Sequence, residues 1–431
     1  MYKNLYVVLF MATWLLYATV ASTAPVCMVK DIAPDAESSF PNYMVELDGV
    51  VFFSAQPSTL ADDQLWKSDG TLTGTVMVSS MDPHWEIVAM NGWVYFRSDD
   101  GGGAGMELWR SDGTTTEMVA DINTYSNFGS NPSNLHVVGN TLFFAADDAD
   151  TPPQPGDHGK ELWKTDGVTT TLVSDITPGT DGSDFDRQCD MGGQLYFHAQ
   201  NTENNLYVSD GTTTTNLTGA MGLTWVDWPL TAANNTVFFV AGEDQYGIEL
   251  YYTDGTVPGT ALLKNINTTV NPTPPPDDMD AWPQPLRSAG TLAYFGANDG
   301  SGAYGLYRSD GSPAGTYRLR SDVELGWDIY GMDGGVAYFG GDDGTGTGLE
   351  LWRTEGSDAT TQLVKDIYPG GDSSGVGFFA HSGDTVFFSA EDGVNGNELW
   401  MSDGTEAGTV MVADINPGVS NADPRYMMDV G

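Results

Sequence analysis

One short motif recurs along this chain and limits what the chain can fold into. It reads QLWKSDGT at 64–71, ELWRSDGT at 107–114, ELYYTDGT at 249–256 and ELWMSDGT at 398–405. The aromatic residue after each Leu marks eight units, at Trp66, Trp109, Trp163, Tyr207, Tyr251, Tyr307, Trp352 and Trp400, spaced by 43 to 56 residues. Repeats of this length indicate a solenoid, an array or a propeller.

The contents of each unit favour the propeller. The third unit reads SNLHVVGN, TLFFAADD, KELWKTDG and TTTLVSDI, which are four short β-type runs separated by Gly-Asn and Asp-Gly turns. Strands joined by hairpins pair antiparallel, and four antiparallel strands in about 40–50 residues make one propeller blade. We therefore predict an all-β fold over residues 27–431, a single β-propeller of four-stranded antiparallel blades. We expect eight blades, with seven as the alternative.

The Asp-Gly of the motif predicts a structural hairpin rather than a copied active site. An Asp in such a turn accepts hydrogen bonds from the backbone of its own turn. Ser/Thr-Asp-Gly here resembles the Asp-box hairpins of sialidase-type propellers. The expected capping residues are Asp69, Asp112, Asp166, Asp210, Asp254, Asp310 and Asp403, while the longer Glu355 of unit seven should cap less well.

The combination of these motifs resembles a known family, the ELWxxDGT repeat proteins, which are secreted bacterial tandem-repeat proteins. The motifs are YF/FF-x-A-x-D, ELW-x-[ST]-DGT and V-x-DI-x-PG, and they cover residues 27–431, although units four and six read NLYVSDGT and GLYRSDGS. The resemblance implies a propeller-like architecture and an extracellular location. It implies no established reaction.

The N-terminus also predicts secretion. Residues 1–24 carry Lys3, an apolar stretch from Leu5 to about Tyr17 and then small residues, as a cleaved signal peptide does. An uncleaved signal anchor is the alternative. After cleavage we expect no membrane insertion and a monomer that is secreted, either free or associated with the cell surface.

Charge excludes one class of partner. The chain has 16 Lys+Arg against 59 Asp+Glu, a net charge of −43, which repels phosphate backbones. Nucleic acid is therefore not an expected partner. The two cysteines, Cys27 and Cys189, provide neither a disulfide framework nor a metal cluster.

Two series of carboxylates predict an acidic face that could bind cations. In a propeller blade, the Asp of V-x-DI and the Glu that begins the third strand emerge on the same side. Oxygen-only ligands suit Ca²⁺, so calcium is the expected ion. The alternative is that these acids cap loop backbones. The candidate metal ligands are Asp121, Asp175, Asp366, Asp414, Glu107, Glu161, Glu350 and Glu398.

Four tryptophans outside the motif indicate a ligand-binding surface. Aromatic faces beside Asp and Asn form platforms for sugar rings. Packing between blades is the alternative. The four candidates are Trp225, Trp228, Trp282 and Trp327.

Enzyme signatures do not stand out. The five histidines lie in different units, and the sequence has no serine nucleophile elbow and no phosphate-binding Gly loop. We therefore expect a non-enzymatic, secreted binding module for glycans or other extracellular macromolecules, including proteins. The alternatives are an extracellular polysaccharide hydrolase or lyase, and a passive repeat segment of a larger cell-surface protein.

The two ends of the repeat region leave spare pieces. Residues from Cys27 resemble a fourth strand, and residues before Gly431 resemble a first strand. Either these pieces close the ring together, or the sequence is truncated at Gly431.

Overall fold

The computed structural model describes residues 26–33, 38–58, 62–124, 129–148, 157–179, 182–200, 204–223, 225–270, 279–302 and 304–429. The side chains of Asp184, Gln200, Asp227, Trp228 and Trp327 lie outside this description. The predicted signal peptide, residues 1–24, does too. In the described parts of the chain, no helix is both long and apolar enough to cross a membrane.

The strands follow one another in groups of four, as the sequence predicts. The first sixteen are β1 (Asn42–Leu47), β2 (Val50–Ala55), β3 (Gln64–Ser68), β4 (Val76–Ser79), β5 (Ile87–Met90), β6 (Trp93–Ser98), β7 (Glu107–Ser111), β8 (Thr116–Ala120), β9 (Ser133–Val138), β10 (Thr141–Asp147), β11 (Lys160–Thr165), β12 (Thr170–Ser174), β13 (Asp184–Met191), β14 (Gln194–Gln200), β15 (Asn205–Ser209) and β16 (Thr214–Asn216). Each group of four is a separate sheet in which strands adjacent in sequence pair antiparallel.

The second half continues the pattern. It contains β17 (Trp225–Ala233), β18 (Thr236–Glu243), β19 (Gly247–Thr253), β20 (Ala261–Lys264), β21 (Leu286–Ala289), β22 (Leu292–Asn298), β23 (Tyr304–Ser309), β24 (Tyr317–Arg318), β25 (Glu324–Gly331), β26 (Ala337–Asp342), β27 (Glu350–Thr354), the 3-10 turn η1 (Asp358–Thr360), β28 (Gln362–Lys365), β29 (Gly377–Ser382), β30 (Thr385–Glu391), β31 (Asn397–Ser402) and β32 (Val410–Ala413). The sheets β17–β20 and β29–β32 are again separate.

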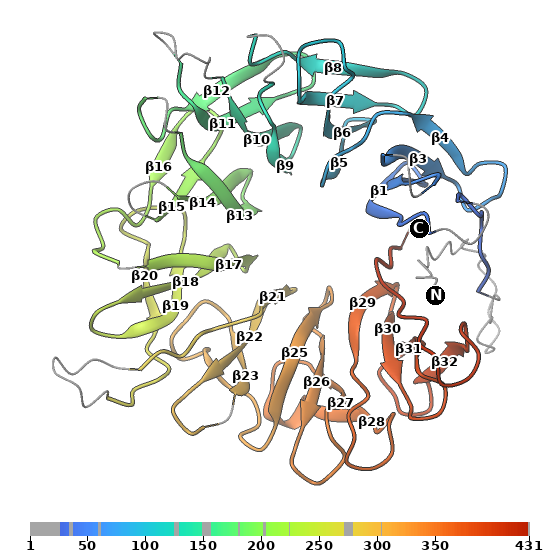
Figure 1. The fold of residues 1–431 in the computed structure, drawn as a ribbon. Coiled ribbons are helices and arrows are strands. Elements are labelled where there is room, and N and C mark those ends of the chain that lie inside the picture. Colours follow the sequence, from blue (N-terminus) through green and yellow to red (C-terminus); the bar gives the residue numbers. More distant parts are fainter. Residues whose placement is uncertain are drawn as a thin grey trace.

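The sheets are arranged as a ring, with the first strand of each group facing the centre (Figure 1). This confirms the all-β propeller of four-stranded antiparallel blades. The core lies between neighbouring blades, because the two faces of each sheet pack against different neighbours. Phe143 of β10, for example, packs with Phe197 and Tyr207 of the next blade. The aromatic residues of the motif are thus part of the wall between blades.

The expectation of eight separate blades is wrong. The described residues form six separate four-stranded blades, and strands β21 to β28 join into one eight-stranded sheet. The join is the pairing of Gly305 in β23 with Glu324 in β25. We attribute the join to the short β24, which has only two residues. The chain leaves the outer edge of β23 after β24, and the start of β25 then pairs with the start of β23.

The first and last described segments, residues 26–33 and the residues up to 429, both pack at the seam between the first and last blades (Figure 1). Ile32 and Met428 pack on the first blade, and Val26 and Met427 pack on the last one. Lys30 donates to the carbonyl of Thr75 at 2.7 Å, as Lys365 does to Thr409 in the following blade. Residues 26–33 therefore occupy the place of an outer strand, and the spare pieces pack together at the seam.

Candidate functional site

Two of the four predicted ligand-binding tryptophans meet in the structure. Trp225 begins the inner strand β17, and Trp282 lies in the segment that leads into β21. Their ring centroids are 5.7 Å apart with an interplanar angle of 68°, an edge-to-face contact. Trp282 keeps 44% of its surface exposed. The pair therefore offers an aromatic platform that solvent can reach.

The backbone fixes Trp282 in place. The amides of Ala281 and Trp282 both donate to the carbonyl of Ile248, at 2.9 and 3.3 Å. The hydroxyl of Tyr304 lies 2.6 Å from the carbonyl oxygen of Trp282. Trp282 itself has φ of 49°, a left-handed conformation that large side chains rarely adopt. A side chain held in this way loses little freedom when a ligand stacks on it.

The other two predicted tryptophans are placed only by their backbone. Trp228 lies in β17, in an interval where the pairing with β18 shifts between Asp227 and Thr231. Trp327 lies in a similar shift in β25, between Leu325 and Ile329. Both are in inner strands, but their side chains are outside the described part of the structure. Their predicted role stays a prediction.

The predicted glutamates serve the backbone of the chain. Glu107, Glu161, Glu249, Glu350 and Glu398 have no exposed surface. Glu161 accepts hydrogen bonds from the amides of Ile176 and Thr177, at 2.8 and 3.0 Å, one on each carboxylate oxygen. Glu350 likewise accepts from Ile367 at 2.7 Å and from Ser374 at 3.0 Å. Each glutamate thus ties the linker to the next blade onto the third strand of its own blade.

Units four and six show what replaces this glutamate. Unit four has Asn205 at this position and unit six has Gly305. There the linker pairs directly with the strand, through Leu217 donating to Leu206 at 2.8 Å and Leu319 donating to Leu306 at 2.7 Å. The equivalent Leu pairs with the fourth strand in the glutamate units as well, for example Leu162 with Ser174 and Leu351 with Lys365, so the glutamate adds contacts to the linker beyond this pairing.

Burial makes these glutamates unusual acids. It raises the pKa of Glu107, Glu350 and Glu398, and it raises the pKa of Glu161 to about 7 against the hydrogen bonds that favour the charged form. Backbone N–H groups point at the carboxylate oxygens, so the environment presents donors where a cation would need acceptors. These four side chains do not fit a calcium site.

The predicted aspartates are not brought together either. Asp121, Asp175 and Asp414 are exposed and Asp366 is half-buried. Within the described ranges, no three His, Cys, Asp or Glu side chains are grouped as metal ligands would be. Calcium binding stays a prediction, and only the aspartate series is left to support it.

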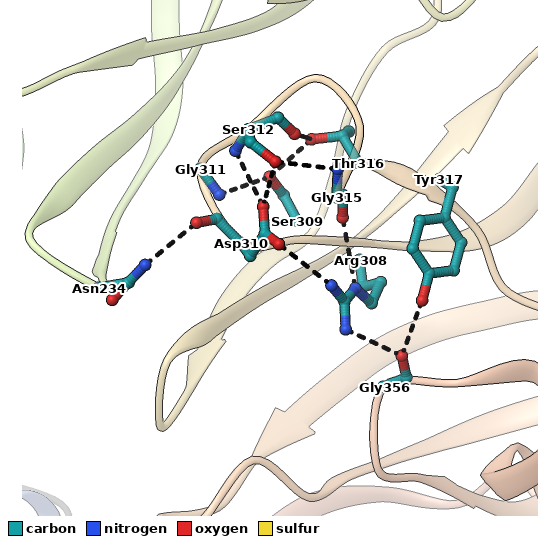
Figure 2. Close-up of polar contacts among 10 residues, drawn as sticks. All are labelled: Asn234, Arg308, Ser309, Asp310, Gly311, Ser312, Gly315, Thr316, Tyr317 and Gly356. Carbon is teal, nitrogen blue, oxygen red and sulfur yellow. Dashed lines mark hydrogen bonds and ion pairs between the residues drawn. The ribbon is translucent and has the colours of Figure 1, made fainter.

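The Asp-Gly turns have the predicted structural role. Figure 2 shows the hairpin of unit six, where Asp310 accepts from the amide and the hydroxyl of Ser312, at 3.0 and 2.7 Å. Arg308 crosses to the next hairpin and donates to the carbonyl of Gly356 at 3.1 Å. The same capping recurs at Asp69, Asp112, Asp166, Asp210, Asp254 and Asp403. Hydrogen bonds from the turn lower the pKa of these aspartates.

Glu355 departs from this pattern, as predicted. Its carboxylate pairs with Arg353, and the turn is completed by Ser357 and Thr360 of η1. The extra methylene carries the carboxylate away from the turn.

Sequence reasoning missed Trp85, which is 70% exposed. Its φ is 68°, and the guanidinium of Arg97 lies 4.5 Å from its ring centroid. Burial raises the pKa of its neighbours Asp82 and Glu86. Its position in the repeat could have revealed it. An aromatic residue also lies just before or at the start of the first strand in several other blades, as Tyr43, Trp225 and Phe378 do.

The comparisons with known proteins add little. No family model matches this sequence and no curated protein matches it, so the ELWxxDGT resemblance stays a prediction. Similar solved structures include a puromycin hydrolase, with 12% identity and a TM-score of 0.40 over 78% of this chain and 54% of that chain. They also include a structure from a study of two prolyl endopeptidases, with 14% identity and a TM-score of 0.39 over 84% of this chain and 53% of that chain.

A puromycin-hydrolysing peptidase of Mycobacterium tuberculosis is similar at the same level, with 10% identity and a TM-score of 0.39 over 78% of this chain and 53% of that chain. This chain thus spans about half the length of the proteins it matches. Such low scores carry no argument about activity. The fold assignment rests on the strand pairing described above.

Proposed function

We propose that this protein is a secreted, non-enzymatic β-propeller that binds glycans outside the cell. The observation that supports the proposal is the exposed Trp225–Trp282 pair, held by the backbone at the start of an inner strand. Sugar rings stack their C–H faces on aromatic rings, and polar groups nearby bind the hydroxyls. Gln284, exposed two residues after Trp282, offers such an amide.

The test is a glycan-array screen followed by titration of tryptophan fluorescence. We expect Trp282→Ala to weaken binding about tenfold, equivalent to about 1.4 kcal/mol. Tyr317→Ala is the matched control, because Tyr317 is an exposed aromatic residue on the opposite, hairpin side. If Trp282→Ala binds glycans as tightly as the wild type, the binding site lies elsewhere. If the protein binds no glycan, a passive repeat segment or a protein ligand is favoured.

A second candidate function, polysaccharide hydrolysis, is favoured by the residues around Trp85. Glycosidases need a carboxyl group whose pKa is raised so that it can act as an acid. Burial raises the pKa of both Asp82 and Glu86, on either side of an exposed aromatic ring. Release of reducing ends from a polysaccharide, lost in Asp82→Asn and Glu86→Gln, would support this function over simple binding.

A further inference from the structure

Exposed aromatic side chains and strained backbone coincide in this protein. Among the described residues, seven aromatic side chains are exposed, and six of them have positive φ. The six are Phe40, Tyr43, Trp85, Trp282, Phe378 and Tyr426, with φ between 42° and 68°; the seventh is Tyr317. Bulky residues pay for this conformation, and such strain gathers at functional sites.

At two of the six residues, Tyr43 and Phe378, the positive φ lies in a bulge of an inner strand, and the other four lie in segments outside the strands. The pairing of β1 with β2 shifts between Asn42 and Val45, an interval that contains Tyr43. The pairing of β29 with β30 shifts between Gly377 and Ala380, around Phe378. In a regular strand both sets of side chains would pack against the neighbouring blades. A bulge turns one side chain out of this alternation.

The inner strands other than β25, which also pairs with β23, have only one paired edge. Their other edge faces the centre of the ring (Figure 1). At a bulge, a side chain can point along the sheet instead of toward either neighbouring blade. In an inner strand it is then exposed at the free edge. Tyr43 and Phe378 are 38% and 51% exposed, although the strands that follow them are buried.

Four of these residues occupy consecutive positions around the ring. Phe378 belongs to the last blade and Tyr426 to the C-terminal segment at the seam. Tyr43 then belongs to the first blade and Trp85 precedes β5 of the second (Figure 1). We refer to Tyr43, Trp85, Phe378 and Tyr426 as the aromatic arc. The same bulge in the third and fourth blades carries Asn134 and Arg187, so the arc ends there.

Two of the four arc residues, Trp85 and Phe378, stack with arginine side chains of the molecule. Arg97 stacks on Trp85 at 4.5 Å and Arg425 stacks on Phe378 at 4.9 Å from the ring centroids. The chain as a whole carries −43 charges. A ligand on the arc is therefore favoured when it combines flat C–H faces with positive charge, and it is disfavoured when it is anionic.

We propose that the aromatic arc binds a polysaccharide chain of amino sugars that carry ammonium groups. Several platforms in a row engage successive sugar units, so that affinity grows with chain length. This inference rests on the proposed glycan-binding function, and it adds the class of ligand and a site distinct from the Trp225–Trp282 pair.

The experiment measures binding of oligosaccharides by calorimetry at about pH 6, where amino sugars are largely protonated. The ligands are the glucosamine dimer and hexamer, cellohexaose, hexagalacturonate and hexalysine. We expect the glucosamine hexamer to bind at least about tenfold more tightly than its dimer. We expect cellohexaose to bind more weakly, hexagalacturonate not to bind, and the hexamer to lose affinity when salt rises from about 0.05 to about 0.3 M.

The variants are Tyr43→Asn and Phe378→Asn. They copy Asn134, which adopts φ of 55° in the equivalent bulge of β9, so that the backbone is kept while the ring is removed. We expect each variant to weaken hexamer binding several-fold and the double variant to abolish the length dependence. Tyr317→Ala is again the control and should bind as the wild type does.

The outcomes separate the two proposals. If cellohexaose binds and Trp282→Ala removes this binding while the arc variants change nothing, the glycan function stands and the arc proposal is overturned. If no saccharide binds, the glycan function itself fails. If hexalysine binds as tightly as the glucosamine hexamer and both depend on Tyr43 and Phe378, the arc is a site for polycations and its assignment to amino sugars is overturned.

Discussion

Glu161→Gln is the substitution that most directly tests how the blades are tied to their linkers. The carboxylate of Glu161 is fully buried and accepts from Ile176, Thr177 and, at 3.4 Å, the hydroxyl of Ser183. Its pKa is raised by burial from 4.5 to about 7. The folded protein therefore holds this proton more tightly than the unfolded chain does. Stability from this group is fully present below its unfolded pKa of 4.5 and is lost as the pH rises through about 7.

The magnitude follows from the shift. A shift from 4.5 to about 7 corresponds to about 3 kcal/mol at roughly 1.36 kcal/mol per pH unit. About 2.5 kcal/mol of this is expressed between about pH 5 and about pH 8. Glutamine has nearly the shape of the protonated acid and never ionises. It loses one acceptor for a buried amide at every pH, which costs about 1–3 kcal/mol.

The assay is urea unfolding of wild type and Glu161→Gln at the two pH values. We compare the free energy of unfolding of the variant minus that of the wild type. We expect this difference to be about 2–3 kcal/mol more positive at about pH 8 than at about pH 5, because only the wild type loses stability over this range. Glu406→Gln, at an exposed position, should show no such change. A pH-independent difference for Glu161→Gln would refute the buried, proton-binding role. Should the variant not fold, titration of the carboxyl carbon of Glu161 by NMR reports the same pKa directly.

Three further predictions concern the turn, the thiols and calcium. Gly315→Ala should destabilise the fold by about 1–2 kcal/mol, because its Cβ would lie 2.0 Å from Oδ1 of Asp310, whereas Gly371→Ala, with its nearest atom at 3.8 Å, should be nearly neutral in thermal unfolding. A thiol reagent at mildly alkaline pH should label the exposed Cys27 quickly and the half-buried Cys189 far more slowly, because desolvation raises the pKa of Cys189 to about 12; equally fast labelling of both would contradict this raised pKa. If calcium binds the exposed aspartates, the Tm should rise between excess chelator and millimolar calcium, and less so in Asp414→Asn; equal Tm values would contradict the calcium prediction.

Much of the fold could be predicted from local sequence. Hairpin chemistry fixes antiparallel pairing between neighbours in the chain, and the FF and ELW runs fix which residues lie between blades. The turn aspartates were predictable for the same reason, since the atoms that Asp310 binds lie within two residues of it. Each of these interactions is local in sequence and recurs from unit to unit, except that Glu355 does not cap the turn of unit seven.

The tertiary structure decided the rest, because the decisive contacts join residues far apart in the chain. The motif shows that Glu161 recurs, but only the fold shows that its two oxygens accept hydrogen bonds from the amides of the linker. Only the ring brings Trp225 against Trp282, and only the short β24 lets Glu324 meet Gly305 and merge two repeats into one sheet. The exposure of Tyr43 and Phe378 also depends on the bulges of the inner strands. A bulge is a difference of register between two strands, and a single strand's sequence does not encode it.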